Sequence, residues 1–200
     1  MSKLTVSNLS CQKGYNLLFE NLSFEVSPGE VIKISGSNGS GKTSLLRIIA
    51  GLSSPESGFI EYKQKKTSGR NHLEKFLYLG HQSALSPELT CIENLEYLNG
   101  LSSGVDTSNI QKALKEIGLN GYENDFSGSL SAGQKRKIVL SMLFITRAKV
   151  WLLDEPFTAL DSNGIQVIEN QIENHCNNGG LCILTTHQKS NIKNLKEVLI

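Results

Sequence analysis

The sequence has no excess of charge of either sign. Its 200 residues include 20 lysines and arginines against 19 aspartates and glutamates, which leaves a formal net charge of +1 at pH 7. Proteins that bind nucleic acids or anionic lipids through a broad electrostatic surface are usually far more basic. We therefore expect no nucleic acid partner.

Long apolar runs are also lacking. The longest mostly apolar stretch extends from Ile138 to Ile145 and is interrupted by Ser141. It is far shorter than the ~20 residues that a membrane-spanning helix requires. The N-terminal segment, Met1 to Val6, has no apolar core of a secretory signal. We expect the chain to stay in the cytosol and not to cross a membrane by itself.

Cysteines are few and widely spaced. The four of them, Cys11, Cys91, Cys176 and Cys182, form no C-x-x-C pair. In a cytosolic chain, isolated cysteines behave as small apolar side chains. We therefore assign them neither a metal site nor a disulfide.

Strand and helix patterns alternate along the chain. A β-branched run at 31–35 leads into a glycine-rich loop and a helix over 43–50, and strands at 150–153 and 181–185 flank a helix that begins near 163. Such alternation predicts an α/β fold with a parallel sheet and helices on its faces. Further strands are expected at 4–8, 17–26, 58–62 and 76–79, with a polar loop over 63–70.

The segment from about 87 to 135 has a different pattern. Its apolar residues, among them Ile92, Leu95, Ile110 and Leu114, recur at intervals of three and four. This spacing is typical of amphipathic helices. We interpret the segment as a helical insertion into the α/β core and expect residues 1–200 to form a single domain.

The glycine-rich loop fits the pattern G-x-x-x-x-G-K-[ST], between a strand and a helix. Glycines allow successive backbone N–H groups to turn inward around an anion, and the start of the helix adds the positive end of its dipole. A lysine at this position reaches the β- and γ-phosphates of a nucleoside triphosphate, and the hydroxyl that follows it binds Mg²⁺. The residues are Gly36, Ser37, Asn38, Gly39, Ser40, Gly41, Lys42 and Thr43.

The strand at 150–153 ends in two carboxylates, Asp154 and Glu155. Two acids at this place can serve separate tasks. Asp154 can hold Mg²⁺ through the water shell of the ion, and Glu155 can orient and deprotonate the attacking water.

A third motif, Leu130-Ser131-Ala132-Gly133-Gln134, precedes Asp154 by 23 residues, counted from Ser131. Alone it could be a helix start with a serine N-cap. Together with the phosphate loop and the acidic strand end, however, it resembles the L-S-G-G-Q signature of the ABC ATPase family, with Ala132 in place of the more frequent glycine. The resemblance implies a P-loop NTPase (RecA-like) core with an N-terminal antiparallel β subdomain and an inserted α-helical signature subdomain.

The resemblance also implies roles for further residues. Gln82 matches the glutamine that senses Mg²⁺ and the attacking water, and His187 matches the histidine that contacts the γ-phosphate. Asp161 matches the loop that meets a second subunit. In this family the signature of one subunit (Ser131, Ala132, Gly133 and Gln134 here) covers the ATP held by the phosphate loop of the other, so a homodimer is expected. The implied catalytic residues are Glu155, His187 and Gln82, and the implied Mg²⁺ residues are Thr43, Gln82 and Asp154.

The residue that contacts adenine stays open. The family usually stacks adenine on an aromatic residue about 23 positions before the first glycine of the phosphate loop. Lys13 occupies that position here, and Tyr15 follows two residues later. Either the aliphatic part of Lys13 or a shifted Tyr15 could contact the base.

The whole chain, and not only its ATP motifs, resembles the ATP-binding subunits of haem exporters in cytochrome c maturation. The stretches that carry this resemblance are Leu18-Phe19, Leu22-Ser23-Phe24, Gly36-Ser37-Asn38-Gly39, Leu79-Gly80-His81-Gln82, Leu89-Thr90, Glu93-Asn94-Leu95, Phe157-Thr158-Ala159, Gly179-Gly180 and Thr185-Thr186-His187-Gln188. This implies a permease partner and a peripheral position on the cytoplasmic side of the bacterial inner membrane. The alternative is the ATPase subunit of another small ABC importer or exporter.

Overall fold

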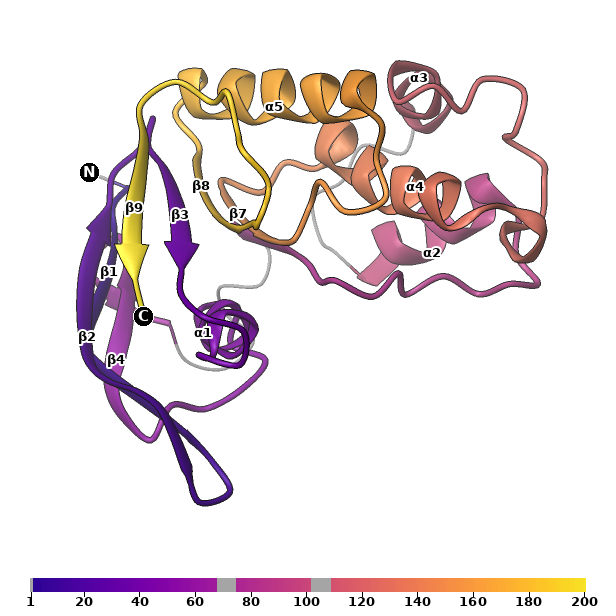
Figure 1. Cartoon of the computed structure of the whole chain (residues 1–200). Helices are drawn as coiled ribbons and strands as arrows, with labels where there is room; N and C mark the ends of the chain where they lie inside the picture. The colour runs from indigo at the N-terminus through magenta and orange to yellow at the C-terminus, as the bar shows by residue number, and fades with distance from the viewer. Residues whose placement is uncertain (1, 68–74, 102–108) are drawn as a thin grey trace.

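Two β-sheets and a group of helices make up the computed structural model, which describes residues 2–67, 75–101 and 109–200. One sheet is parallel and lies in the middle of the molecule; the other is antiparallel and lies at one side (Figure 1). Helix α1 (Lys42–Ile49) lies between the two sheets, and the other helices among the described residues pack on the far face of the parallel sheet. This layered arrangement confirms the predicted P-loop NTPase core.

The parallel sheet has the strand order β6-β7-β8-β3-β9. Its side chains point alternately to the two faces, as the period of a strand requires. Trp151 and Leu153 of β7 face the outer helices, whereas Val150 and Leu152 face α1. The strands are β3 (Val31–Ser35), β6 (Phe76–Leu79), β7 (Val150–Asp154), β8 (Leu181–Thr185) and β9 (Leu195–Leu199).

The antiparallel sheet has the order β2-β1-β4-β5. Its strands are β1 (Leu4–Lys13), β2 (Asn16–Val26), β4 (Ser57–Tyr62) and β5 (Lys65–Lys66). The loop predicted over 63–70 is therefore wrong at Lys65 and Lys66, because a tight turn at Lys63 and Gln64, both at positive φ, returns the chain against β4. Residues 68–70 of that prediction lie outside the described residues. Two lysines carry no strand signal of their own, and backbone pairing with Glu61 and Tyr62 decides their conformation.

Helix α1 buries its apolar face between the two sheets. Leu45, Leu46, Ile48 and Ile49 are 0–4% exposed and pack against both sheets. Burying four such side chains contributes roughly 1.5–3 kcal/mol each, which fixes the helix relative to β3. Because the loop from 36 to 41 connects these two rigid elements, its two ends are fixed in space.

The helices of the outer layer pack against one another and on the parallel sheet. They are α2 (Cys91–Leu101), α3 (Ile110–Glu116), α4 (Ala132–Ile145) and α5 (Ser162–Asn177), with a 3-10 turn at Ser127–Ser129. On this face the indole of Trp151 stacks on the imidazole of His175, with centroids 3.7 Å apart and planes 6° from parallel. All four cysteines are buried and unpaired, as expected of small apolar side chains.

Strand β9 was not predicted from the sequence. Only Leu195, Val198 and Leu199 among its residues are apolar, and the strand lies at the edge of the sheet, where few side chains are covered. Among the described residues, no helix is both long enough and apolar enough to cross a lipid bilayer.

Candidate functional site

The phosphate loop follows β3 directly and ends at the first turn of α1. Gly39 and Gly41 have φ angles of 85° and 101°, which only glycine adopts easily. A Cβ on Gly41 would also lie 3.0 Å from the Cβ of Leu18. The ammonium of Lys42 folds back over the loop and donates to the carbonyls of Gly36 (2.8 Å) and Ser37 (2.9 Å). The loop thus holds a cation at its centre.

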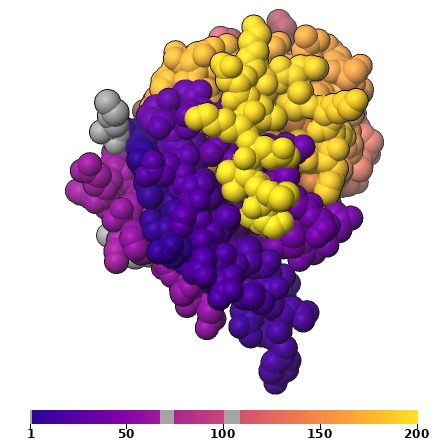
Figure 2. Space-filling model, turned by 60° about the vertical axis from the view of Figure 1, so that its left-hand side comes forward, coloured from indigo at the N-terminus to yellow at the C-terminus, as the bar shows by residue number. Residues whose placement is uncertain are grey.

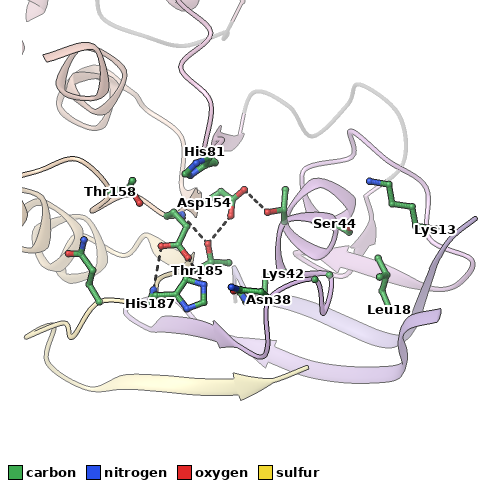
Figure 3. Close-up of a pocket in the computed structure, with 15 residues that line it drawn as sticks. Lys13, Leu18, Asn38, Lys42, Ser44, His81, Asp154, Thr158, Thr185 and His187 are labelled. Carbon is green, nitrogen blue, oxygen red and sulfur yellow. Dashed lines mark hydrogen bonds and ion pairs between the residues drawn. The ribbon is translucent and has the colours of Figure 1, made fainter. Parts of the chain in front are cut away.

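A pocket of about 610 Å³ opens beside this loop. Its floor is formed by the loop and by the carboxyl ends of β7 and β8, which is where α/β sheets bind ligands. Figure 3 shows side chains from the two halves of the chain facing each other across it. The lining residues are Lys13, Leu18, Asn38, Gly39, Gly41, Lys42, Thr43, Ser44, His81, Asp154, Glu155, Thr158, Thr185, His187 and Gln188.

Asp154 lies at the centre of a hydrogen-bond network. Its side chain accepts from the hydroxyl of Thr43 at one oxygen and from the hydroxyl of Thr185 at the other, both at 2.8 Å. Asp154 and Thr185 are paired in register on neighbouring strands, and both are buried. The network therefore joins the start of α1 to the ends of β7 and β8 and fixes the direction of the carboxylate.

Glu155 follows with an unusual backbone. Its φ is 50°, in the left-handed region that is strained for a residue with a side chain. Its N–H donates to the hydroxyl of Thr185 at 2.9 Å. The carboxylate is 18% exposed and lies 3.5 Å from Nε2 of His187, whose backbone N–H also lies 3.4 Å from it. The structure thus brings Glu155 and His187 together at the mouth of the pocket.

Gln82 does not line the pocket. It is exposed, and its neighbour His81 is the lining residue from this segment.

The signature residues lie away from the pocket, at the start of α4. Ser131 and Gln134 form a capping box, in which the Ser131 hydroxyl accepts from the Gln134 N–H at 3.2 Å and the Ser131 N–H donates to the Gln134 side chain at 2.9 Å. A Cβ on Gly133 would lie 2.8 Å from the carbonyl oxygen of Ala159. The signature therefore packs tightly on the loop that ends at Asp161, which caps α5 by accepting from the Gly164 N–H at 2.7 Å.

At the other end of the pocket, Lys13 and Leu18 form the wall (Figure 3). Tyr15, by contrast, is fully exposed at the tip of the β1–β2 hairpin and does not line the pocket. This hairpin projects from the body of the molecule (Figure 2). Of the two candidates for a base contact, only Lys13 faces the pocket in this structure.

Several lining residues were not found from the sequence. They are Leu18, Ser44, His81, Thr158, Thr185 and Gln188. Thr185 could have been found, because a threonine at the end of a parallel strand next to an acidic strand end faces the same crevice. Leu18 carries no such signal, since an apolar residue on a strand normally predicts core.

Comparison with known proteins places the chain in a family. The family model described as ABC transporter matches residues 19–158. Curated relatives include a cytochrome c biogenesis ATP-binding export protein CcmA from Vibrio vulnificus, 43% identical, with 92% of each chain covered. The protein of the same name from Sodalis glossinidius is 41% identical, with 92% of this chain and 89% of the relative covered.

Solved structures show the same fold. A putative ABC transporter ATP-binding protein from Pyrococcus furiosus has a TM-score of 0.84 at 22% identity, with 99% of this chain and 97% of that chain covered. A dimeric ATP-binding cassette in a post-hydrolysis state, bound to ADP and Pi, has a TM-score of 0.81 at 24% identity and covers 92% of this chain and 88% of its own. The chain belongs to the ABC transporter family of ATP-binding proteins, among relatives of the cytochrome c biogenesis export type.

Proposed function

We propose that this chain is the ATP-hydrolysing subunit of an ABC complex for c-type cytochrome biogenesis, of the haem exporter type. The observation that carries the proposal is the convergence of Lys42, Thr43, Asp154, Glu155 and His187 in one pocket. Relatives of more than 40% identity along nearly the whole chain carry the cytochrome c biogenesis name, which favours this pathway over other small importers or exporters.

The triphosphate is held by the loop from Gly36 to Thr43. Lys42 already binds two carbonyls there, and a phosphate oxygen is a stronger partner for an ammonium than a neutral carbonyl. Lys42 therefore moves from the carbonyls to the β- and γ-phosphates when ATP enters. The base lies toward Lys13 and Leu18, at the opposite end of the pocket.

The residues at the strand end fit Mg²⁺. This ion prefers hard oxygen ligands and keeps several waters, and the Thr43 hydroxyl and the Asp154 carboxylate converge at 2.8 Å. Thr43 would bind the ion directly, Asp154 through water, and Gln82 would join from its own loop. When bound, Mg²⁺ neutralises charge on the phosphates.

Glu155 acts as the general base. Its carboxylate lies at the mouth of the pocket and accepts the proton of a water that attacks the γ-phosphate. His187, beside Glu155 at 3.5 Å, orients that water and contacts the γ-phosphate. Gln82, which lies outside the pocket in this structure, would sense the water and the ion once its loop approaches the pocket.

A second copy of the chain completes each site. The signature residues Ser131 to Gln134 start a helix outside the pocket and lie partly or fully exposed, so they are free to cover the γ-phosphate held by a partner copy. Asp161 is exposed nearby and meets that partner. A homodimer thus binds two ATP molecules at its interface, and hydrolysis releases the two copies.

The membrane partner is a permease of the cytochrome c maturation type. It docks on the segment from 81 to 88, next to Gln82, and holds the subunit at the cytoplasmic side of the inner membrane. In this arrangement, closure of the dimer around ATP moves the helical insertion (about 87–135) together with the permease.

The experiment is to trap the complex. A tagged Glu155→Gln variant binds ATP without turnover, so ATP is added to detergent-solubilised membranes and the co-purifying proteins are identified. A permease together with haem-handling cytochrome c assembly proteins supports the proposal, whereas an unrelated permease refutes the pathway but not the ATPase mechanism. Wild-type complex that hydrolyses ATP no faster than Glu155→Gln would refute the mechanism.

A further inference from the structure

Arg136 of α4 is a buried cation with an unusual set of partners. Only 4% of the residue is exposed. Its guanidinium donates to four backbone carbonyls, those of Gly80 (2.7 Å), His81 (3.5 Å), Asp154 (2.9 Å) and Glu155 (2.9 Å). These carbonyls belong to two separate segments, which follow the neighbouring strands β6 and β7.

Burying the charge of Arg136 costs desolvation free energy, which its hydrogen bonds and nearby negative charges must offset. Burial lowers the pKa of Arg136, while the negative charges of Asp154 and Glu155 oppose that shift. A guanidinium, with five donors in a rigid fork, can bind several carbonyls at once, whereas a lysine ammonium acts as a single point charge. The arrangement is therefore specific for arginine.

Two of the four carbonyls, those of Asp154 and Glu155, lie on either side of the strained φ torsion of Glu155. Glu155 has a φ of 50°, and such a conformation persists only where the surroundings hold it from several sides. Here the hydroxyl of Thr185 holds its N–H, and Arg136 holds its carbonyl. Both contacts come from elements far away in the sequence, so the direction of the Glu155 carboxylate depends on them.

The other two carbonyls belong to the segment next to Gln82, and Arg136 lies five residues after Ser131 on the same helix. One side chain therefore connects the start of α4, the segment at 80–81 and the end of β7. A shift of α4 would act on both segments through the same guanidinium.

We propose that Arg136 is a positioning residue for hydrolysis, which holds the left-handed peptide of Glu155 and couples its direction to α4 and to the segment at His81. The inference rests on the proposed role of Glu155 as general base. Arg136 touches neither ATP nor the attacking water. It acts through the backbone that carries Glu155.

The test compares Arg136→Lys and Arg136→Met in the complete complex with its permease. We expect kcat for ATP hydrolysis to fall by up to about 100-fold in Arg136→Lys, as for other small displacements of a reacting group. The Kd for ATP should not change, because the phosphate loop keeps its contacts. Arg136→Met should lose at least as much activity, since four carbonyls lose their donor.

Lys137→Met is the matched control. Lys137 is half-buried on the same helix, and its ammonium lies near Gly118, away from the pocket. Its substitution should leave kcat at the wild-type value. A merely structural role of Arg136 would instead lower the melting temperature and the fraction of ATP-binding protein, with normal kcat per binding site, and that result would overturn the proposal.

A double-mutant cycle with Thr185→Val gives a second test. If Arg136 and Thr185 both act by holding the peptide of Glu155, their effects on kcat are less than multiplicative. Multiplicative effects would refute a shared action on that peptide. Wild-type complex without hydrolysis would overturn the proposed function, whereas active wild type together with fully active Arg136→Lys would overturn this inference alone.

Discussion

The pH dependence of stability should show the contribution of His175. The imidazole stacks on Trp151 under the helix layer, and burial lowers its pKa from 6.5 to about 4, with backbone groups of Leu181 and Lys149 offsetting only part of that shift. In the unfolded chain the same imidazole takes up a proton near pH 6.5. The unfolded state therefore binds one more proton than the native state between about pH 6.5 and pH 4.

The sign and size of the effect follow from this difference. The contribution of the neutral His175 to the free energy of unfolding is fully present above pH 6.5 and is lost as the pH falls toward the native pKa. Since one pKa unit corresponds to about 1.4 kcal/mol, the complete loss is about 3 kcal/mol, of which about 2 kcal/mol is lost between pH 7 and pH 5. For a protein whose total stability is about 5–15 kcal/mol, that is a large fraction.

The assay is urea unfolding at pH 7 and pH 5 for the wild type and for His175→Phe. The phenyl ring keeps an aromatic partner for Trp151 but cannot be protonated, so the loss between the two pH values should be about 2 kcal/mol smaller in the variant. The two proteins are compared only by this pH-dependent loss and not by their absolute stability, because the larger phenyl ring also contacts Gly180, where the imidazole already packs closely. His81→Gln, at an exposed position, should keep the wild-type pH dependence. Equal losses in the wild type and His175→Phe would refute the reasoning.

Four further substitutions test the site. Lys13→Ala should weaken ATP binding by up to about tenfold, or 1.4 kcal/mol, whereas Tyr15→Ala should leave it unchanged; titration calorimetry decides, and the opposite result would place Tyr15 over the base. Gly41→Ala should abolish ATP binding, because a side chain at φ 101° is strained and would meet Leu18; retained binding would contradict the tight loop. Gly133→Ala should reduce hydrolysis while the subunit alone still binds ATP, since its Cβ would displace the loop at Ala159; wild-type turnover would show that this contact is dispensable.

The central strands and the phosphate loop could be predicted because their signals are local. The β-branched run at 31–35 forms β3, which is buried at Val31, Ile32 and Ile34, and the apolar run at 150–153 lies in β7, where every residue is buried. A strand buried on both faces needs a largely apolar sequence. The loop pattern restricts backbone conformation directly, through glycines at positive φ.

One edge strand of each sheet, β5 and β9, could not be predicted. Strand β5 consists of two lysines, and β9 has two charged residues in its middle. Their strand conformation depends on backbone pairing, of β5 with β4 and of β9 with β3. The side chains of β5 and β9 themselves do not indicate this pairing. No residue of β5 or β9 is fully buried, so the sequence carries little apolar pattern there.

Within the site, the sequence identified ionisable groups and glycines but not their supports. Asp154, Glu155 and His187 were predicted from motifs and lie together. The hydroxyl of Thr185 and the guanidinium of Arg136, which hold the backbone around Glu155, were not assigned any role. Both act on backbone groups from a distance of 19 residues or more along the chain, and no local pattern indicates such contacts.

The position of β8 in the sheet has a consequence for biosynthesis. Strands β3 and β7 do not pair with each other, since β8 lies between them and pairs with both. As the ribosome adds residues in order, the nascent chain contains the phosphate loop and both acidic residues long before residues 181–185 exist. The parallel sheet is continuous from β3 to β7 only when this late strand is inserted. A chain that ends before β8 therefore lacks the strand that joins β3 to β7, the Thr185 hydroxyl that holds Asp154 and Glu155, and His187.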